Sequence, residues 1–67
     1  MAVARVTTIV ASSKEGWQDA AEQGFKRASK TLRGITGLKI QEQTAQVQRG
    51  KIVEYRVRMT VTFVLEG

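Results

Sequence analysis

The side chains in this sequence that could bind a ligand are mainly basic. Lys26, Arg27, Lys30 and Arg33 recur at helical spacing and could together bind a phosphate group. The same residues would also form the solvated face of a helix, because cations are favoured near its carboxyl end and acids near its start. We favour this second interpretation, since acidic residues occupy the earlier turns of the same segment.

A second basic pair lies near the carboxyl end of the chain. Arg56 and Arg58 alternate with apolar residues and share a polar strand face with Glu54. Two guanidinium groups projecting from one sheet face could bind a phosphate or a carboxylate. The alternative, which we slightly favour, is ion pairing with Glu42 or Glu54, either across strands or between subunits.

Trp17 is the single tryptophan of the chain. An indole ring can stack on a planar ligand, but this one falls on the same helix face as Ala20, Ala21 and Phe25. Packing in the core is therefore the favoured interpretation.

The sequence contains no histidine and no cysteine. It therefore lacks thiol nucleophiles, histidine general bases and Ser-His-Asp triads, and it has no residues for a structural zinc site. The six Asp and Glu residues show no EF-hand spacing, although a cation shared between subunits would leave no motif in one chain. We expect a binding protein and no enzyme, and metal ligands stay unknown.

Composition indicates which partners to expect. Eleven Lys and Arg residues against six Asp and Glu residues give a net charge of +5, which suggests an anionic ligand. Nucleic acid is disfavoured, because Tyr55 and Phe63 belong to an apolar strand face and form no stacking platform. No apolar run approaches the ~20 residues of a membrane span, and the first residues lack the features of a secretory signal. We expect a cytoplasmic protein with no membrane partner.

The length of the chain favours self-association. Residues 1–67 are expected to form a single domain, and a domain of this size buries only ~60% of its unfolded surface. Disulfides and zinc are not available to stabilise so small a core, which leaves oligomerisation as the usual means.

One helix is predicted between Lys14 and Arg33. Ser12 or Ser13 would cap its start, with Ser12 and Glu15 forming a capping box, and Gly34 would end it. Residues three and four positions apart form one apolar or small face. That face consists of Trp17, Ala20, Ala21, Gly24, Phe25, Ala28 and Leu32.

Three strands are predicted around this helix. Val3–Val10 is rich in β-branched residues, Ile35–Val47 is a more polar strand, and residues 48–51 form a turn. The last strand has apolar residues at every second position, which predicts one buried face. These residues are Val53, Tyr55, Val57, Met59, Val61, Phe63 and Leu65.

The element order β-α-β-β predicts an α+β fold. Placing the third strand between the other two makes every neighbouring pair antiparallel, so we expect a three-stranded sheet of order 1-3-2 wrapped around the helix. A third strand of ~13–15 residues would extend ~45 Å, more than one helix can cover. Either the strand bends around the helix or other subunits cover its ends.

Two segments resemble the dodecin family. They are SSKEGWQDAA at the start of the helix and YRVRMTVTFVLE in the last strand, and the element order and length also agree. The resemblance implies the same β-α-β-β fold and a hollow homododecameric shell.

The resemblance also identifies positions that contact flavin in the family. Flavins there stack in pairs between tryptophans of neighbouring subunits, and a glutamine hydrogen-bonds the ring edge. The tryptophan position is Gly37 here and the glutamine position is Arg56. Glycine offers no ring, and arginine can only donate hydrogen bonds. The sequence is more similar to a branch without the tryptophan, which includes a calcium-binding group.

We therefore expect a dodecin-like homododecamer that binds or stores a small ligand, with the stacked-flavin site degenerate at Gly37 and Arg56. The ligand could be a small anion or a cation such as calcium. The alternative is an FMN- or riboflavin-binding storage flavoprotein, in which Arg56 binds the phosphate of FMN.

Overall fold

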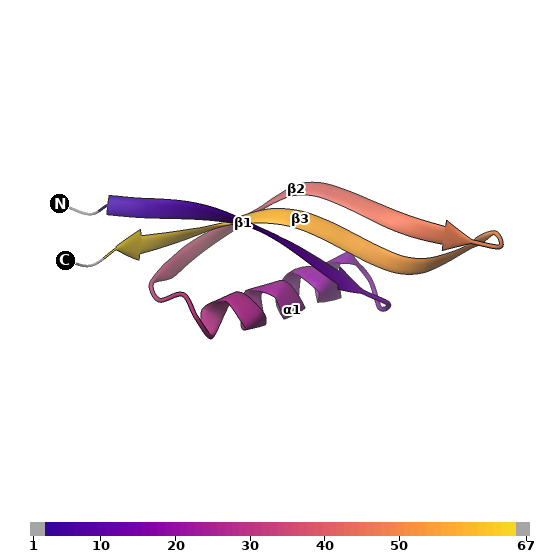
Figure 1. Cartoon of the computed structure of the whole chain (residues 1–67), viewed down its shortest axis with the longest axis horizontal. Helices are drawn as coiled ribbons and strands as arrows, with labels where there is room; N and C mark the ends of the chain where they lie inside the picture. The colour runs from indigo at the N-terminus through magenta and orange to yellow at the C-terminus, as the bar shows by residue number, and fades with distance from the viewer. Residues whose placement is uncertain (1–2, 66–67) are drawn as a thin grey trace.

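The computed structural model describes residues 3–65 as four elements. They are β1 (Val3–Ser13), α1 (Trp17–Ser29), β2 (Ile35–Gln48) and β3 (Lys51–Leu65). The strands form one antiparallel sheet in the order β1-β3-β2, and α1 lies along one face of it (Figure 1). The predicted fold class and strand order are confirmed.

The sheet is much longer than the helix. The molecule measures 52 × 19 × 13 Å, and the hairpin of β2 and β3 extends past the start of α1 (Figure 1). We call residues 46–54, at the end of this hairpin, the arm. Its two turn residues, Arg49 and Gly50, have φ angles of 54° and 74°, a left-handed pair that suits a tight hairpin. The turn was predicted correctly.

The core lies between α1 and the middle of β3. Val57, Met59 and Val61 are fully buried, which confirms the period-two pattern of the last strand in its central part. Small residues on α1 allow the helix to lie close to the sheet. A Cβ atom on Gly24 would be 2.7 Å from Met59 Cε and 3.0 Å from Ala11 Cβ, so only glycine fits there without a shift.

The predicted helix start was wrong. The helix begins at Trp17, and its N-cap is Gly16, which makes no side-chain capping bond. Ser12 is still in β1, opposite Arg56, so the capping box with Glu15 does not form. Ser13 instead accepts a hydrogen bond from the Glu15 backbone N–H at 2.9 Å and donates its hydroxyl to Asp19. The sheet ladder, which continues through Ser13, prevents the helix from starting earlier.

The predicted helix end was also wrong. The helix ends at Ser29, and Gly34 lies five residues further along the chain. Gly34 has a φ angle of 73°, and its carbonyl accepts a hydrogen bond from Val64 N–H at 2.9 Å. A Cβ atom there would be 2.9 Å from the carbonyl oxygen of Val64. The glycine therefore serves the entry into β2 and has no role as a helix cap.

Candidate functional site

The sheet has an inner face that contacts α1 and an outer face that does not. Because side chains alternate along a strand, the burial of Val57 and Met59 places Arg56 and Arg58 on the outer face. Arg56 lies in register between Ser12 of β1 and Thr44 of β2. This row of three residues therefore combines a guanidinium group with two hydroxyl side chains. The sequence alone does not predict this grouping, because it depends on the register of the strands.

Arg56 pairs with Glu54, two residues before it on the same strand. The distance from Nη2 to Glu54 Oε2 is 3.2 Å, and this is the one ion pair between side chains within residues 3–65. The expected partner Glu54 is therefore found for Arg56, but the pair forms within β3 and does not cross strands or subunits. The pair is 44% and 28% exposed, so we expect it to add at most about 1 kcal/mol.

Gly37 also belongs to the outer face, opposite Thr62. No atom lies within 4 Å of a Cβ added to Gly37, and its φ angle is outside the left-handed region. Thr62 and Arg56 are six residues apart on β3, which corresponds to about 20 Å. One chain therefore does not bring Gly37 and Arg56 together, and a ligand that contacts both would need two copies.

Trp17 lies on the inner face, as predicted. It packs against the core, and its ring makes an edge contact with Tyr55 at a centroid distance of 4.9 Å. Its Nε1–H donates a hydrogen bond to the Thr44 carbonyl at 2.9 Å, which ties the start of α1 to β2. Trp17 is therefore on the opposite side of the sheet from Gly37.

Replacing Trp17 with phenylalanine tests the role of this hydrogen bond. The variant keeps an aromatic ring against Tyr55 but removes the Nε1–H donor to Thr44. We expect the free energy of unfolding to fall by about 1 kcal/mol, the usual net contribution of one hydrogen bond. Urea unfolding at fixed protein concentration measures the change. A Trp17→Phe variant as stable as the parent would show that the indole hydrogen bond contributes nothing.

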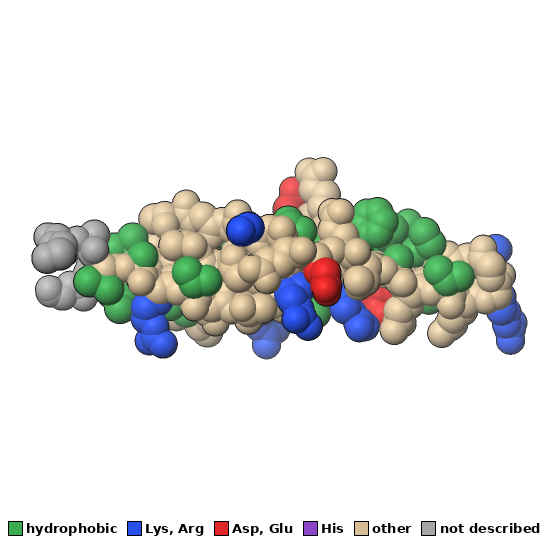
Figure 2. Space-filling view, turned by 90° about the horizontal axis from the view of Figure 1, so that it is seen from above, with side chains coloured by type: hydrophobic (Ala, Val, Ile, Leu, Met, Phe, Trp, Pro, Cys, Tyr) green, Lys and Arg blue, Asp and Glu red, His purple; other side chains and the backbone are tan. Residues whose placement is uncertain are grey.

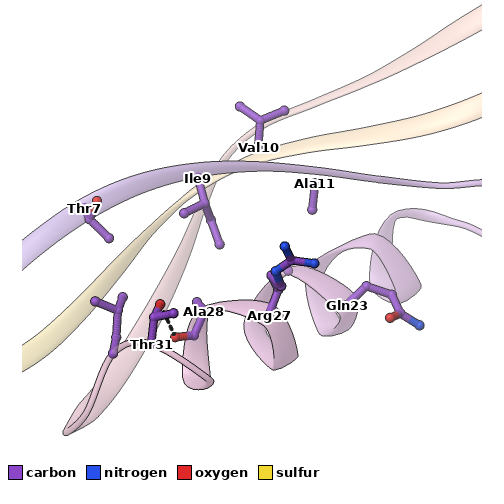
Figure 3. Close-up of a pocket in the computed structure, with 10 residues that line it drawn as sticks. Thr7, Ile9, Val10, Ala11, Gln23, Arg27, Ala28 and Thr31 are labelled. Atoms are coloured by element: carbon purple, nitrogen blue, oxygen red, sulfur yellow. Dashed lines mark hydrogen bonds between the residues drawn. The ribbon is translucent and has the colours of Figure 1, made fainter.

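A groove of about 460 Å³ lies between β1 and α1. Figure 3 shows Ile9 and Ala11 pointing from β1 towards the helix, Val10 pointing the other way, and Arg27 extending from α1 towards β1. Arg33 lines a second hollow, beside Phe63 and Leu65. Lys26 and Arg27 are within α1, whereas Lys30 and Arg33 lie beyond its last residue, Ser29. Arg27 and Arg33 border different grooves, which does not favour one phosphate site made by the four residues.

The view of Figure 2 shows hydrophobic side chains towards both ends of the molecule and a mixed group of acidic and basic side chains near the middle. The exposed apolar residues include Val3, Val6 and Val10 of β1 and Val47, Ile52 and Val53 of the arm. Within residues 3–65, no three acidic side chains come together as a metal site. The same part of the chain has no helix long and apolar enough to cross a membrane.

A model of the dodecin family matches residues 3–66. The chain belongs to the dodecin family. The dodecin of Streptomyces davaonensis is 36% identical, with a TM-score of 0.93 over 98% of this chain and 97% of that one. The tt0972 protein of Thermus thermophilus is 30% identical, with a TM-score of 0.94 over 100% and 98% of the two chains.

A third solved structure is described as a calcium-chelating antigen, the calcium dodecin of Mycobacterium tuberculosis. It is 31% identical, with a TM-score of 0.82 over 96% of this chain and 91% of that one. None of the curated proteins matches the chain.

Proposed function

We propose that this dodecin is the subunit of a hollow homododecameric shell that binds or stores a small ligand without the stacked flavin pair of its family. The observation that carries this proposal is the outer face at Gly37, where the backbone is open and no side chain provides a stacking surface. Stacking a planar ring on an aromatic side chain contributes about 1–3 kcal/mol, and Gly37 cannot supply it.

The chemistry of Arg56 supports the same proposal. A glutamine amide both donates and accepts hydrogen bonds, whereas a guanidinium group only donates them. Arg56 therefore cannot accept a hydrogen bond from a flavin ring edge. With Ser12 and Thr44 beside it, Arg56 suits an anionic group such as a phosphate or a carboxylate, which would replace the Glu54 carboxylate that it now contacts.

The exposed apolar surface supports assembly. Between Val3 and Leu65, ten large hydrophobic side chains are exposed, against three large and two small ones in the core. Covering these side chains with further copies would add the burial that a 67-residue chain cannot obtain alone. A shell also provides the two copies that a ligand contacting Gly37 and Arg56 would need.

Calcium would require carboxylates from more than one copy, because residues 3–65 hold no three-ligand group. The calcium dodecin of Mycobacterium tuberculosis gives this second ligand class some support. Isothermal titration calorimetry of the assembled shell with calcium tests this ligand: saturable heat of binding would support it, and its absence would exclude it.

An absorbance spectrum and a flavin titration of the purified protein test the proposal. We expect no visible flavin absorbance and only weak quenching of FMN or riboflavin fluorescence, because the stacking ring is absent. Quenching at micromolar protein or better would instead support the flavoprotein function, with Arg56 binding the FMN phosphate. In that case the substitution Arg56→Gln would weaken the binding of FMN more than the binding of riboflavin, because riboflavin lacks the phosphate.

A further inference from the structure

The groove between β1 and α1 has an apolar floor. Gly24 and Ala28 are buried residues of the helix that line it, and Ile9 points towards them from β1 (Figure 3). Leu32, which follows the helix, is half-buried and lines the same groove. The volume of about 460 Å³ falls in the range of about 300–1,000 Å³ that is usual for small-molecule pockets. The groove therefore has room for the apolar part of a small molecule.

The rim of this groove is polar. Arg27 extends from α1 towards β1, and Gln23 lies one turn earlier on the same side of the helix (Figure 3). Among the lining residues, all of which lie in the described part of the chain, Arg27 is the one charged group. A guanidinium group can donate two parallel hydrogen bonds to a carboxylate. The rim therefore suits an acid whose apolar portion lies in the groove.

The charge of Arg27 is not paired with a carboxylate between Val3 and Leu65, where the one ion pair lies within β3. The acidic residues of α1 make other contacts. Glu22, five positions before Arg27, accepts a hydrogen bond from Gln18. Asp19 is eight positions before it, about 12 Å along the helix axis, and accepts a hydrogen bond from Ser13. Arg27 therefore offers its guanidinium group to a ligand.

We propose that this groove binds a medium-chain carboxylate, with the alkyl chain against Ile9, Ala28 and Leu32 and the carboxylate on Arg27. An alkyl chain matches the apolar floor, because its burial there removes apolar surface from water. A single negative charge matches the single guanidinium group of the lining. The site lies on the inner side of the sheet, so it is separate from Arg56 and goes beyond the ligand site proposed on the outer face.

Isothermal titration calorimetry of the purified protein with decanoate tests the charged part of the site. The titration is made below the concentration at which decanoate forms micelles. We expect saturable binding that Arg27→Gln weakens about tenfold or more, because the variant removes a charged hydrogen-bond donor. Lys26→Gln is the matched control, since Lys26 is the neighbouring residue of α1 but does not line the groove, and it should leave binding unchanged. Decanol, which has the same alkyl chain without a charge, should bind more weakly than decanoate.

A pair of variants on β1 tests the apolar part of the site. Thr7 lines the groove, so Thr7→Phe should abolish decanoate binding by placing a ring where the alkyl chain would lie. Thr8→Phe is the matched control, because Thr8 is the next residue of the same strand and its side chain is on the outer face. Circular dichroism of both variants checks that the fold is kept. Equal loss of binding in the two variants would contradict the placement of the alkyl chain.

Two results would overturn the groove as a binding site. One is the absence of saturable decanoate binding by the unmodified protein. The other is binding that Arg56→Gln removes and Arg27→Gln keeps, because the carboxylate would then lie on the outer face. Neither result bears on the proposed shell, which depends on the number of subunits and the absence of flavin. A folded monomer that binds decanoate through Arg27 would contradict the shell and support the groove site.

Discussion

A variant with Gly37→Trp and Arg56→Gln is expected to bind FMN and riboflavin about ten- to a hundred-fold more tightly than the unmodified protein. The ring would restore a stacking contribution of about 1–3 kcal/mol, and the amide would restore an acceptor beside a donor. The backbone at Gly37 can accept a side chain, because its φ angle is ordinary and the space around a Cβ is open within the chain.

The two substitutions should act together. Stacking and edge hydrogen bonds orient the same ring, so the double variant should gain more than the sum of the single variants. Quenching of flavin fluorescence measures the binding affinity of the unmodified protein, the two single variants and the double variant. Thr8→Trp is the matched control, because Thr8 is exposed on the outer face of β1, outside the family's flavin positions. Equal binding by this control, or none by the double variant, would contradict the assignment of the site.

Met59→Ala is expected to lower the free energy of unfolding by about 2–5 kcal/mol. Met59 is fully buried at the centre of the sheet and lies against Gly24 of the helix, so its truncation leaves a cavity that the small helix residues cannot fill. Unfolding must be followed at fixed protein concentration, because dissociation and unfolding are coupled in an oligomer.

Val64→Ala provides the comparison for Met59→Ala. Val64 is only partly buried, on the opposite face of β3, so we expect its truncation to cost about 1 kcal/mol or less. A loss below 1 kcal/mol for Met59→Ala would show that the core is centred elsewhere.

The strands and their order could be predicted because the pattern of β3 is so regular. The alternation that buries Val57, Met59 and Val61 fixes one face of the central strand, and antiparallel pairing then leaves one arrangement for the other two. The ends of the helix could not be predicted in the same way. Ser13 has the same propensity to cap a helix wherever it lies, and only its pairing with Tyr55 keeps it in the strand.

The geometry of the candidate site could be predicted from the sequence only in part. Gly37 and Arg56 were identified from the family resemblance, but their common face depends on the pairing of Gly37 with Thr62 across a register shift, which alternation does not predict. The separation of about 20 Å depends on the register of β2 with β3, including the register shift after Ile35. The arm could not be identified either, because its exposure depends on where α1 begins relative to Tyr55.

Native mass spectrometry of the purified protein tests whether the chain forms a flavin-free shell of twelve subunits. It measures both the number of subunits and any bound ligand in one experiment. We expect a species of twelve chains of 7.4 kDa each, without the added mass of flavin. A folded monomer at micromolar concentration, or a shell carrying stoichiometric flavin, would contradict it.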